Sequence, residues 1–224
     1  MFSCLPNIIL LIILSISLWG CGTISSNEDH DRQKAAAKIN ARLGMAYLEQ
    51  HDVIRAKQKF LLAMQQGPSL PETWYSMAYF LETTGNKEKA KIHYLKAIQL
   101  EPDRGDTLNN YGTFLCRAGD YPGAIQQFLK ATQDPTYLEV AAAYENAGLC
   151  TLKSAHPHEA KHYFEKALTE DPNRSTSLIE LAEVNYKLGN YLLARKELDQ
   201  YLRSFSPTAQ TYYLEKQIDG KLNS

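Results

Sequence analysis

The chain has 224 residues, with 24 basic and 25 acidic side chains and a formal net charge of −1. This length allows one or two ordinary domains. The balanced charge lacks the basic excess through which nucleic-acid-binding proteins attract phosphates, and no base-reading motif occurs. We therefore expect no nucleic-acid partner.

The N-terminus contains an apolar run from Ile8 to Leu18. This run is shorter than the roughly 20 apolar residues of a membrane-spanning helix. It is typical of the hydrophobic region of a secretory signal peptide. The sequence Leu18-Trp19-Gly20-Cys21 follows at once and resembles the lipobox of bacterial lipoproteins. That resemblance implies cleavage after Gly20 and attachment of lipid to Cys21.

Two features depart from the lipoprotein pattern. Trp19 is bulkier than the usual residue before the small one, and residues 1–20 contain no Lys or Arg. An uncleaved anchor, or an ordinary signal peptide with a chance cysteine, is therefore the alternative interpretation. We predict a lipoprotein signal peptide over residues 1–20 and a polar, lipidated tether over 21–34. By the enterobacterial sorting rule, the absence of Asp after Cys21 implies an outer-membrane location.

The rest of the chain repeats one pattern of small, aromatic and proline residues. An alanine recurs at spacings of 34, 34, 36 and 34 residues, and an aromatic residue or leucine follows it four positions later each time. The alanines are Ala56, Ala90, Ala124, Ala160 and Ala194; their partners are Phe60, Tyr94, Phe128, Phe164 and Leu198. A repeat of about 34 residues with this punctuation is typical of the tetratricopeptide repeat, a helix–turn–helix unit. Gly44 and Ala56 should let the two helices of the first unit approach closely.

The predicted fold is therefore an all-α tetratricopeptide-repeat superhelix over residues 35–224. We expect five repeats and a C-terminal capping helix, with a loosened turn near Thr136–Val140, where two extra residues fall. The predicted repeats are 37–70, 71–104, 105–138, 141–174 and 175–208, and the capping helix is 209–224. Stacking of neighbouring repeats supplies a core that no single repeat can form.

No catalytic constellation is visible in the sequence. His158 and His162 lie four residues apart, as helical metal ligands can, but no cysteine or acid completes a recognisable set. We interpret them as solvated. Phosphate-binding and dinucleotide-binding motifs do not occur, so we expect a protein that is not an enzyme and holds no cofactor or metal.

Cys116 and Cys150 fall on the first helices of adjacent repeats and could meet across that interface. The residues alone leave two interpretations equally open, a disulfide and a pair of buried free thiols. A thiol oxidoreductase using this pair is a further alternative. The lack of a Cys-x-x-Cys motif disfavours it.

Two stretches around these cysteines carry a family resemblance. Residues 108–116 read Leu-Asn-Asn-Tyr-Gly-Thr-Phe-Leu-Cys and residues 144–150 read Tyr-Glu-Asn-Ala-Gly-Leu-Cys. Together with the lipobox, they resemble the PilF/PilW family of type IV pilus biogenesis lipoproteins. The resemblance implies that Cys116 and Cys150 are bridged. It also implies that the protein is a pilotin, which helps the secretin PilQ reach the outer membrane and multimerise there. Longer members carry a complete sixth repeat, which this chain replaces with residues 209–224.

The concave wall of such an array is lined by the first helices, so a partner is expected to bind there. Counting positions within each repeat, the inward residues of the first two repeats are apolar: Ala41, Met45, Leu48, Tyr75 and Tyr79. Those of later repeats are polar and include Asp106, Asn109, Thr113, Arg117, Glu145, Lys153, Glu183 and Lys187. The apolar set is either a partner-binding groove or ordinary core under the N-terminal segment.

Two binding functions fit these features. The first is an outer-membrane pilotin bound to PilQ and other type IV pilus assembly proteins and held on the membrane by its lipid. The second is a scaffold lipoprotein of outer-membrane β-barrel assembly that resembles BamD. The two stretches around the cysteines favour the first function.

Overall fold

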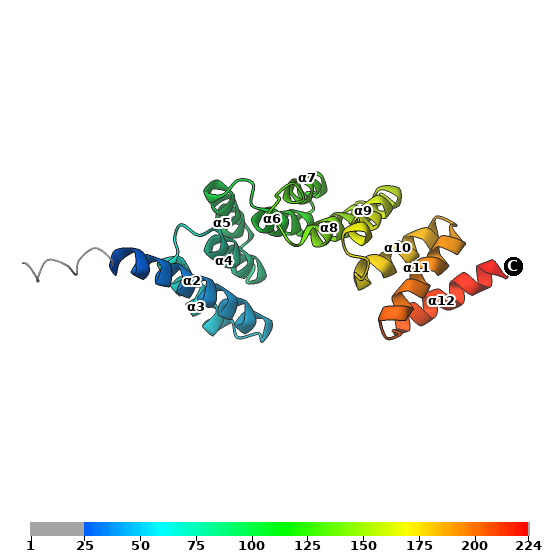
Figure 1. Ribbon diagram of the computed structural model, residues 1–224, viewed down its shortest axis with the longest axis horizontal. Coiled ribbons are helices and arrows are strands. Elements are labelled where there is room, and N and C mark those ends of the chain that lie inside the picture. The colour runs from blue at the N-terminus through cyan, green and yellow to red at the C-terminus, as the bar shows by residue number, and fades with distance from the viewer. Residues whose placement is uncertain (1–24, 224) are drawn as a thin grey trace, which may run out of the picture. The chain divides into compact units, whose positions relative to one another are not determined.

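The computed structural model describes residues 25–223, which form eleven α-helices and no β-strand (Figure 1). In chain order they are α2 (Ser25–Glu49), α3 (Val53–Gln66), α4 (Pro71–Thr83), α5 (Lys87–Leu100), α6 (Gly105–Ala118), α7 (Tyr121–Ala131), α8 (Val140–Lys153), α9 (Pro157–Glu170), α10 (Ser175–Lys187), α11 (Tyr191–Ser204) and α12 (Ala209–Leu222). Within residues 25–223, no helix combines the length and apolar content that crossing a bilayer requires. The all-α tetratricopeptide-repeat fold is confirmed. The signal peptide expected over residues 1–20 lies outside the described residues.

The chain divides into two compact units, residues 1–77 and 78–224, and the boundary falls inside α4. In the first unit, α2 packs against α3. Gly44 lies so close to the buried Phe60 ring that a Cβ atom there would sit 2.6 Å from it. The Asn40 side chain donates a hydrogen bond to Gln66 Oε1 at 2.8 Å and so joins the two helices near the end of α3. The small residue and the aromatic ring therefore set the close approach of the pair.

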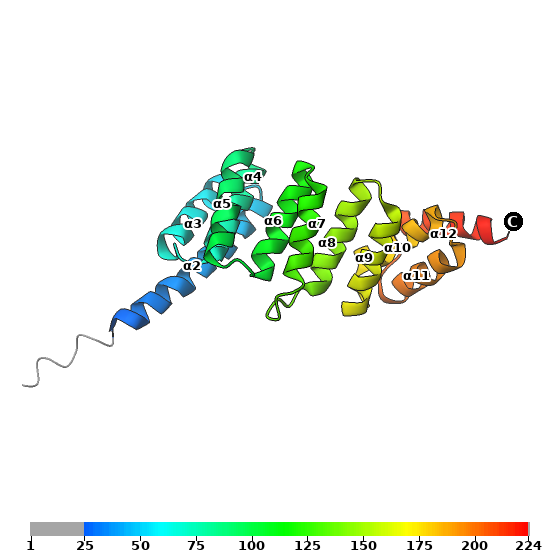
Figure 2. The same ribbon diagram turned by 90° about the horizontal axis from the view of Figure 1, so that it is seen from above.

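The first helix begins earlier than the sequence indicated. We expected it to start at Ala35, after a tether over residues 21–34, whereas α2 begins at Ser25. Residues 25–34 contain neither glycine nor proline, and the ion pairs Glu28–Arg32 (3.6 Å) and Asp31–Lys34 (4.0 Å) join side chains one helical turn apart. Such pairs favour helix over coil. The first turns of α2 consequently project beyond α3 (Figure 2), and the tether prediction is wrong from Ser25 onward.

The second unit repeats the same pairing in α6–α7, α8–α9 and α10–α11. Gly112 packs on Phe128 and Gly148 packs on Phe164, as Gly44 does on Phe60. In the pair α10–α11 the corresponding residues are Ala182 and Leu198, and both are fully buried. A small residue on the first helix therefore still faces a large one on the second, even where the glycine and the ring are both replaced.

Two first helices of the second unit are capped by carboxylates from distant segments. Neither α6 nor α10 has a side-chain hydrogen bond from its own N-cap residue. Instead Asp134, in the connection before α8, accepts a hydrogen bond from Gly105 N at 2.8 Å. Glu145 of α8 accepts hydrogen bonds from Ser177 N at 3.1 Å and from Ser177 Oγ at 2.7 Å. These carboxylates satisfy N–H groups that a helix start leaves without partners, and they tie neighbouring repeats together.

The turn between the two helices of each repeat contains one residue with left-handed backbone. Glycine occupies this place three times, at Gly85, Gly119 and Gly189. The other two residues are His51 and Ala155, with φ of 60° and 63°. Only glycine adopts this conformation without steric cost, so these two turns carry local strain.

The chain closes with α12, which lies against the last helix pair. Leu214 and Ile218 enter a core with Leu178, Ile179, Ala182, Ala194, Leu198 and Tyr201. Arg195 of α11 contacts Glu215 at 3.2 Å and Asp219 at 2.6 Å. Thr208 and Thr211 form a reciprocal capping box at the start of the helix. The segment thus covers apolar surface with its inner side and presents charged groups beside α11.

Candidate functional site

The five residues expected to line an apolar groove divide into two groups. Ala41 and Leu48 are only 4% and 7% exposed. They continue the buried stripe of Ala37 and Gly44 along one side of α2, as residues three or four positions apart on a helix do. Both therefore belong to the core, and the expectation that they line a groove is corrected for these two residues.

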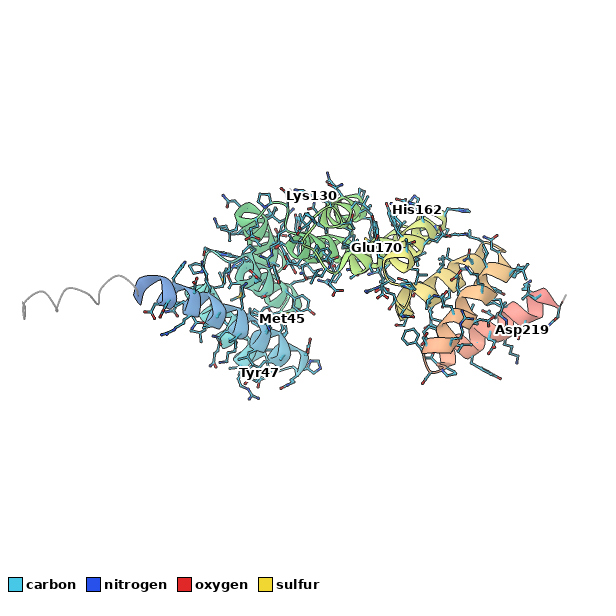
Figure 3. All side chains as sticks on the ribbon, in the orientation of Figure 1. Met45, Tyr47, Lys130, His162, Glu170 and Asp219 are labelled. Atoms are coloured by element: carbon cyan, nitrogen blue, oxygen red, sulfur yellow. A yellow bond between two sulfur atoms is a disulfide. The ribbon has the colours of Figure 1, made fainter. Side chains whose placement is uncertain are left out.

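Met45, Tyr75 and Tyr79 are half-buried, so part of each side chain is open to a partner. Met45 and Tyr75 belong to the first unit and Tyr79 to the second. Met45 and Tyr47 leave α2 on different sides (Figure 3), because residues two apart on a helix are separated by about 200°. Tyr47 instead carries the guanidinium of Arg55 over its ring at 4.6 Å.

In the second unit, Tyr79 borders a small hollow built around an ion pair. Arg117 donates two hydrogen bonds to the Glu82 carboxylate, at 2.6 and 2.7 Å, and its guanidinium lies 5.8 Å from the centre of the Tyr79 ring. The paired carboxylate raises the pKa of Arg117. Thr83 and Lys87 complete the hollow, which has a volume of about 310 Å³. The hollow offers an aromatic face beside a neutralised ion pair, and Lys87 adds a positive charge to its lining.

Some polar residues expected on the inner wall have structural roles instead. Glu145 is buried and receives hydrogen bonds from both Arg174 and Ser177. Asn109 accepts a hydrogen bond from Asn146 Nδ2 at 3.0 Å, which links α6 to α8. The sequence placed Glu145 in the groove because position alone cannot show that the next repeat covers it.

Cys116 and Cys150 form a disulfide between α6 and α8, with their Cα atoms 5.8 Å apart. Both residues are buried. They are separated by 34 residues, and closing a loop of that size stabilises the fold by about 4 kcal/mol on the chain-entropy estimate. The bond lies between two helices that also share the Asn109–Asn146 contact, so it reinforces an existing interface.

Another hollow lies between α10 and α12, and the sequence pattern did not identify it. It has a volume of about 290 Å³ and is lined by Glu183, Tyr186, Lys187, Gln210, Tyr213, Leu214 and Gln217. Tyr213 is the fifth residue of its segment, as Tyr75 is of the second repeat, so the repeat numbering could have identified it. Nearby, burial and the charge of Glu183 raise the pKa of Glu180.

His158 and His162 are exposed on α9. Among the described residues, no three or more His, Cys, Asp or Glu side chains are grouped as a metal site requires. Cys21, the expected lipid attachment site, lies outside the described residues.

Comparison with known proteins places the chain in a family. Models of the tetratricopeptide repeat match residues 71–104, 93–126 and 152–218. The type IV pilus assembly protein PilF of Pseudomonas aeruginosa is 30% identical over 210 residues, which cover 92% of this chain and 82% of that protein. An uncharacterized protein of Haemophilus influenzae is 30% identical over 131 residues, covering 58% of this chain and 73% of that protein.

Solved structures agree with this placement. A structure of Pseudomonas aeruginosa PilF matches with a TM-score of 0.76 and 29% identity, covering 85% of this chain and 86% of that one. PilW, described as a widely conserved type IV pilus biogenesis factor, matches with a TM-score of 0.72 and 26% identity, covering 84% and 86%. The chain belongs to the PilF/PilW family of tetratricopeptide-repeat proteins of type IV pilus assembly.

Proposed function

We propose that this protein is a non-catalytic, lipid-anchored pilotin of the outer membrane. It binds the type IV pilus secretin, PilQ, and promotes both its localisation to the outer membrane and its multimerisation. The similarity to Pseudomonas aeruginosa PilF over 92% of the chain is the observation that supports this proposal. The described residues contribute apolar and aromatic docking surface, which suits a binding protein.

The lipid anchor is proposed at Cys21, within the sequence Leu18-Trp19-Gly20-Cys21. Several acyl chains on one cysteine give stable membrane attachment where a single chain does not. Because α2 begins at Ser25, only the three residues 22–24 would lie between the lipidated cysteine and the first helix. The anchor would therefore hold the repeat body close to the bilayer.

The secretin segment is proposed to dock on Met45 and Tyr75 of the first unit, and Tyr79 is proposed separately as a contact residue of the second unit. Methionine adapts its shape to an apolar partner, and tyrosine adds a large apolar surface with a polar tip. An extended or helical peptide that presents apolar side chains fits such a surface. Ala41 and Leu48 are excluded from this set because they are buried.

The proposed mechanism requires no covalent chemistry. Attaching the binding surface to the membrane raises the effective concentration of bound secretin subunits at that surface. Assembly steps between neighbouring subunits then gain from proximity without any new contact. Loss of either the anchor or the docking surface should therefore impair assembly.

The test is a non-denaturing gel of the secretin from a strain that lacks this protein. We expect secretin monomers in place of multimers, and recovery of multimers when the intact gene is returned. Cys21→Ser should leave the repeat body intact but fail to place multimers in the outer membrane. Normal amounts of correctly placed multimers in the deletion strain would contradict the proposal.

The docking surface is tested by Met45→Glu in a pull-down from detergent-solubilised membranes. The matched control is Met64→Glu, which changes another half-buried methionine of the same helix pair. We expect Met45→Glu to release the secretin while Met64→Glu retains it, with similar unfolding midpoints for both variants. Full retention by Met45→Glu and by Tyr79→Ala would remove these residues from the docking surface.

A further inference from the structure

The connection between α7 and α8 is longer than the other connections that lead from one repeat to the next segment. It contains the eight residues 132–139, whereas the connections at 67–70, 101–104, 171–174 and 205–208 contain four residues each. It is the long loop between α7 and α8 in Figure 2, and it holds the two residues that widen one repeat spacing from 34 to 36. Four residues suffice to join the other repeats, so stacking alone does not account for the longer connection.

The longer connection is held in one conformation by hydrogen bonds and packing. Thr136 donates two hydrogen bonds to Asp134 Oδ1, from its backbone N–H at 2.8 Å and from its hydroxyl at 2.7 Å. The other oxygen of that carboxylate accepts the hydrogen bond from Gly105 N at the start of α6. The Tyr137 ring lies over Gly105, which has no Cβ atom to obstruct it, and packs against the buried Leu108. A surface held in this way loses little conformational freedom when a ligand binds.

The longer connection forms one wall of a hollow with a volume of about 750 Å³. The other wall is the connection between α5 and α6, and both walls belong to the second unit. We name this space the connection hollow. Leu138 lines it and is 93% exposed, while Leu100, Pro102 and Tyr137 add further apolar atoms. Its volume is within the range of about 300–1,000 Å³ that is usual for ligand sites. The hollow therefore has room for several side chains of a partner.

The charges of the lining residues indicate which kind of partner fits. Five of these residues are carboxylates: Glu101, Asp103, Asp106, Asp134 and Glu139. Arg104 is the cation of the lining, and it contacts Glu101 at 3.0 Å and Asp106 at 2.7 Å. Lys130 of α7 contacts Asp103 at 3.0 Å. Two cations thus contact three of the five carboxylates, and the hollow keeps an excess of negative charge.

This excess of negative charge acts on Tyr137 inside the hollow. Burial, followed by the charges of Glu139 and Asp106, raises the pKa of the Tyr137 hydroxyl, and the positive Arg174 opposes the shift more weakly. A hollow with negative charge and apolar walls concentrates cations. Complementary charge also selects a basic partner over an acidic one.

We propose that the connection hollow docks a protein segment in which lysine or arginine stands next to an apolar side chain. The cationic end lies among the carboxylates, and its aliphatic stem packs along Tyr137. The neighbouring apolar side chain covers Leu138, which a small cation would leave exposed. The hollow shares no residue with the proposed secretin-docking set, so this inference stands independently of the pilotin function.

The test measures fluorescence anisotropy of a labelled peptide, Gly-Ser-Arg-Leu-Arg-Ser-Gly, titrated with the full chain, beside a peptide with serine in place of leucine. Glu139→Lys reverses a charge without removing a capping hydrogen bond, and Glu88→Lys in the first turn of α5 is its matched control. Leu138→Ser is matched by Leu192→Ser, because Leu192 is also an exposed leucine. We expect Glu139→Lys to weaken binding of the leucine peptide at least threefold, and Leu138→Ser to abolish the preference for leucine over serine. Both control variants should bind as the parent does.

Equal affinity of the parent and Glu139→Lys, at equal unfolding midpoints, would overturn the proposal. An equal loss in Glu88→Lys would also overturn it, since the peptide would then respond to net charge alone. Equal binding of the two peptides would show that the hollow takes a cation without an apolar contact, which contradicts a protein segment.

Photocrosslinking in cells identifies the occupant directly. The photoreactive residue p-benzoylphenylalanine is placed at position 138 and, as the control, at position 192. We expect stronger crosslinking at 138, to a segment whose sequence carries lysine or arginine within two residues of an apolar side chain, and a loss of that product when Glu139→Lys is added. Crosslinking at 138 no stronger than at 192, or only to lipid or to a second copy of this chain, would overturn the proposal.

Discussion

The first helix pair, α2–α3, and the last one, α10–α11, follow the same packing rule, a small residue against a large one. They differ in the side chains that they expose. In α2–α3 the rule leaves Ile39, Leu43 and Leu61 exposed. Beside α11, the added helix α12 buries Leu214 and Ile218 and places Glu215 and Asp219 against Arg195. Identical helix pairing therefore does not decide what a terminal repeat shows to its surroundings. The surface that a terminal repeat presents is decided by a few residues outside the packing positions.

The largest expected difference concerns two isoleucines. Ile218→Asp places an unpaired charge in a fully buried site, which should cost more than about 4 kcal/mol of the free energy of unfolding. Ile39→Asp changes an exposed side chain, so we expect a change within about 0.5 kcal/mol. Urea unfolding of both variants measures the difference. A similar large loss in both would show that Ile39 is already packed in the free protein.

Substitutions of the left-handed turn residues in the two pairs should change the stability of the protein in opposite directions. Gly189→Ala forces a Cβ into left-handed backbone at φ 78° and should destabilise the protein by about 1 kcal/mol. His51→Gly relieves the same strain at φ 60°, although the greater freedom of glycine in the unfolded chain offsets part of the gain. We expect a rise of a few tenths of a kcal/mol. Thermal unfolding of the two variants checks the signs, and a loss of stability in His51→Gly would contradict the strain argument.

The ion cluster on the last pair should contribute modestly. Arg195→Ala removes contacts to Glu215 and Asp219, and all three side chains are partly exposed to solvent. Because solvent screens such pairs, we expect a loss of about 1 kcal/mol or less, which shrinks in high salt. Lys196→Ala on the same helix is the control. An unchanged loss at high salt would show that Arg195 acts through packing instead of charge.

The smallest expected effects are changes in stability with pH. They too have opposite signs in the first and the last helix pair. The Arg55 backbone N–H and the Arg55 side chain hold the pKa of Asp52, the N-cap of α3, below its ordinary value. A carboxyl group with a lowered pKa stabilises the fold above its unfolded pKa, about 3.9, and loses that contribution as the pH falls through its folded pKa. Asp52→Asn should therefore be destabilised at pH 7 and resemble the parent at the lowest pH.

Glu180 in the last pair behaves in the opposite way. Burial, followed by the charge of Glu183, raises its pKa, so the ionised group weakens the fold at neutral pH. That penalty is relieved as the pH falls through the raised folded pKa. Glu180→Gln should therefore gain stability at pH 7, and the gain should shrink toward pH 4. Unfolding midpoints measured from pH 3 to 7 compare the two carboxyl groups, and a gain that grows on acidification would contradict the assigned cause.

The sequence by itself determined the repeat and its helices, because the pattern is local and recurs. Ala56 and Phe60 report on the approach of two helices close together in the chain, and the same pair recurs through Ala194 and Leu198 with nearly constant spacing. The capping role of residues 209–224 also followed from a change in their polarity. Because the pattern recurs five times, it remains recognisable even though any single position tolerates other residues.

The tertiary structure alone decided which residues of the inner wall are accessible. Ala41, Leu48 and Glu145 sit at positions that the numbering assigns to a groove, yet neighbouring helices cover them. Asp134 and Glu145 cap helices whose starts lie about 30 residues away in the chain, and Tyr186 and Tyr213 meet only because α12 packs beside α10. Burial and capping of this kind depend on side chains that come together only when the repeats stack, so no local pattern encodes them.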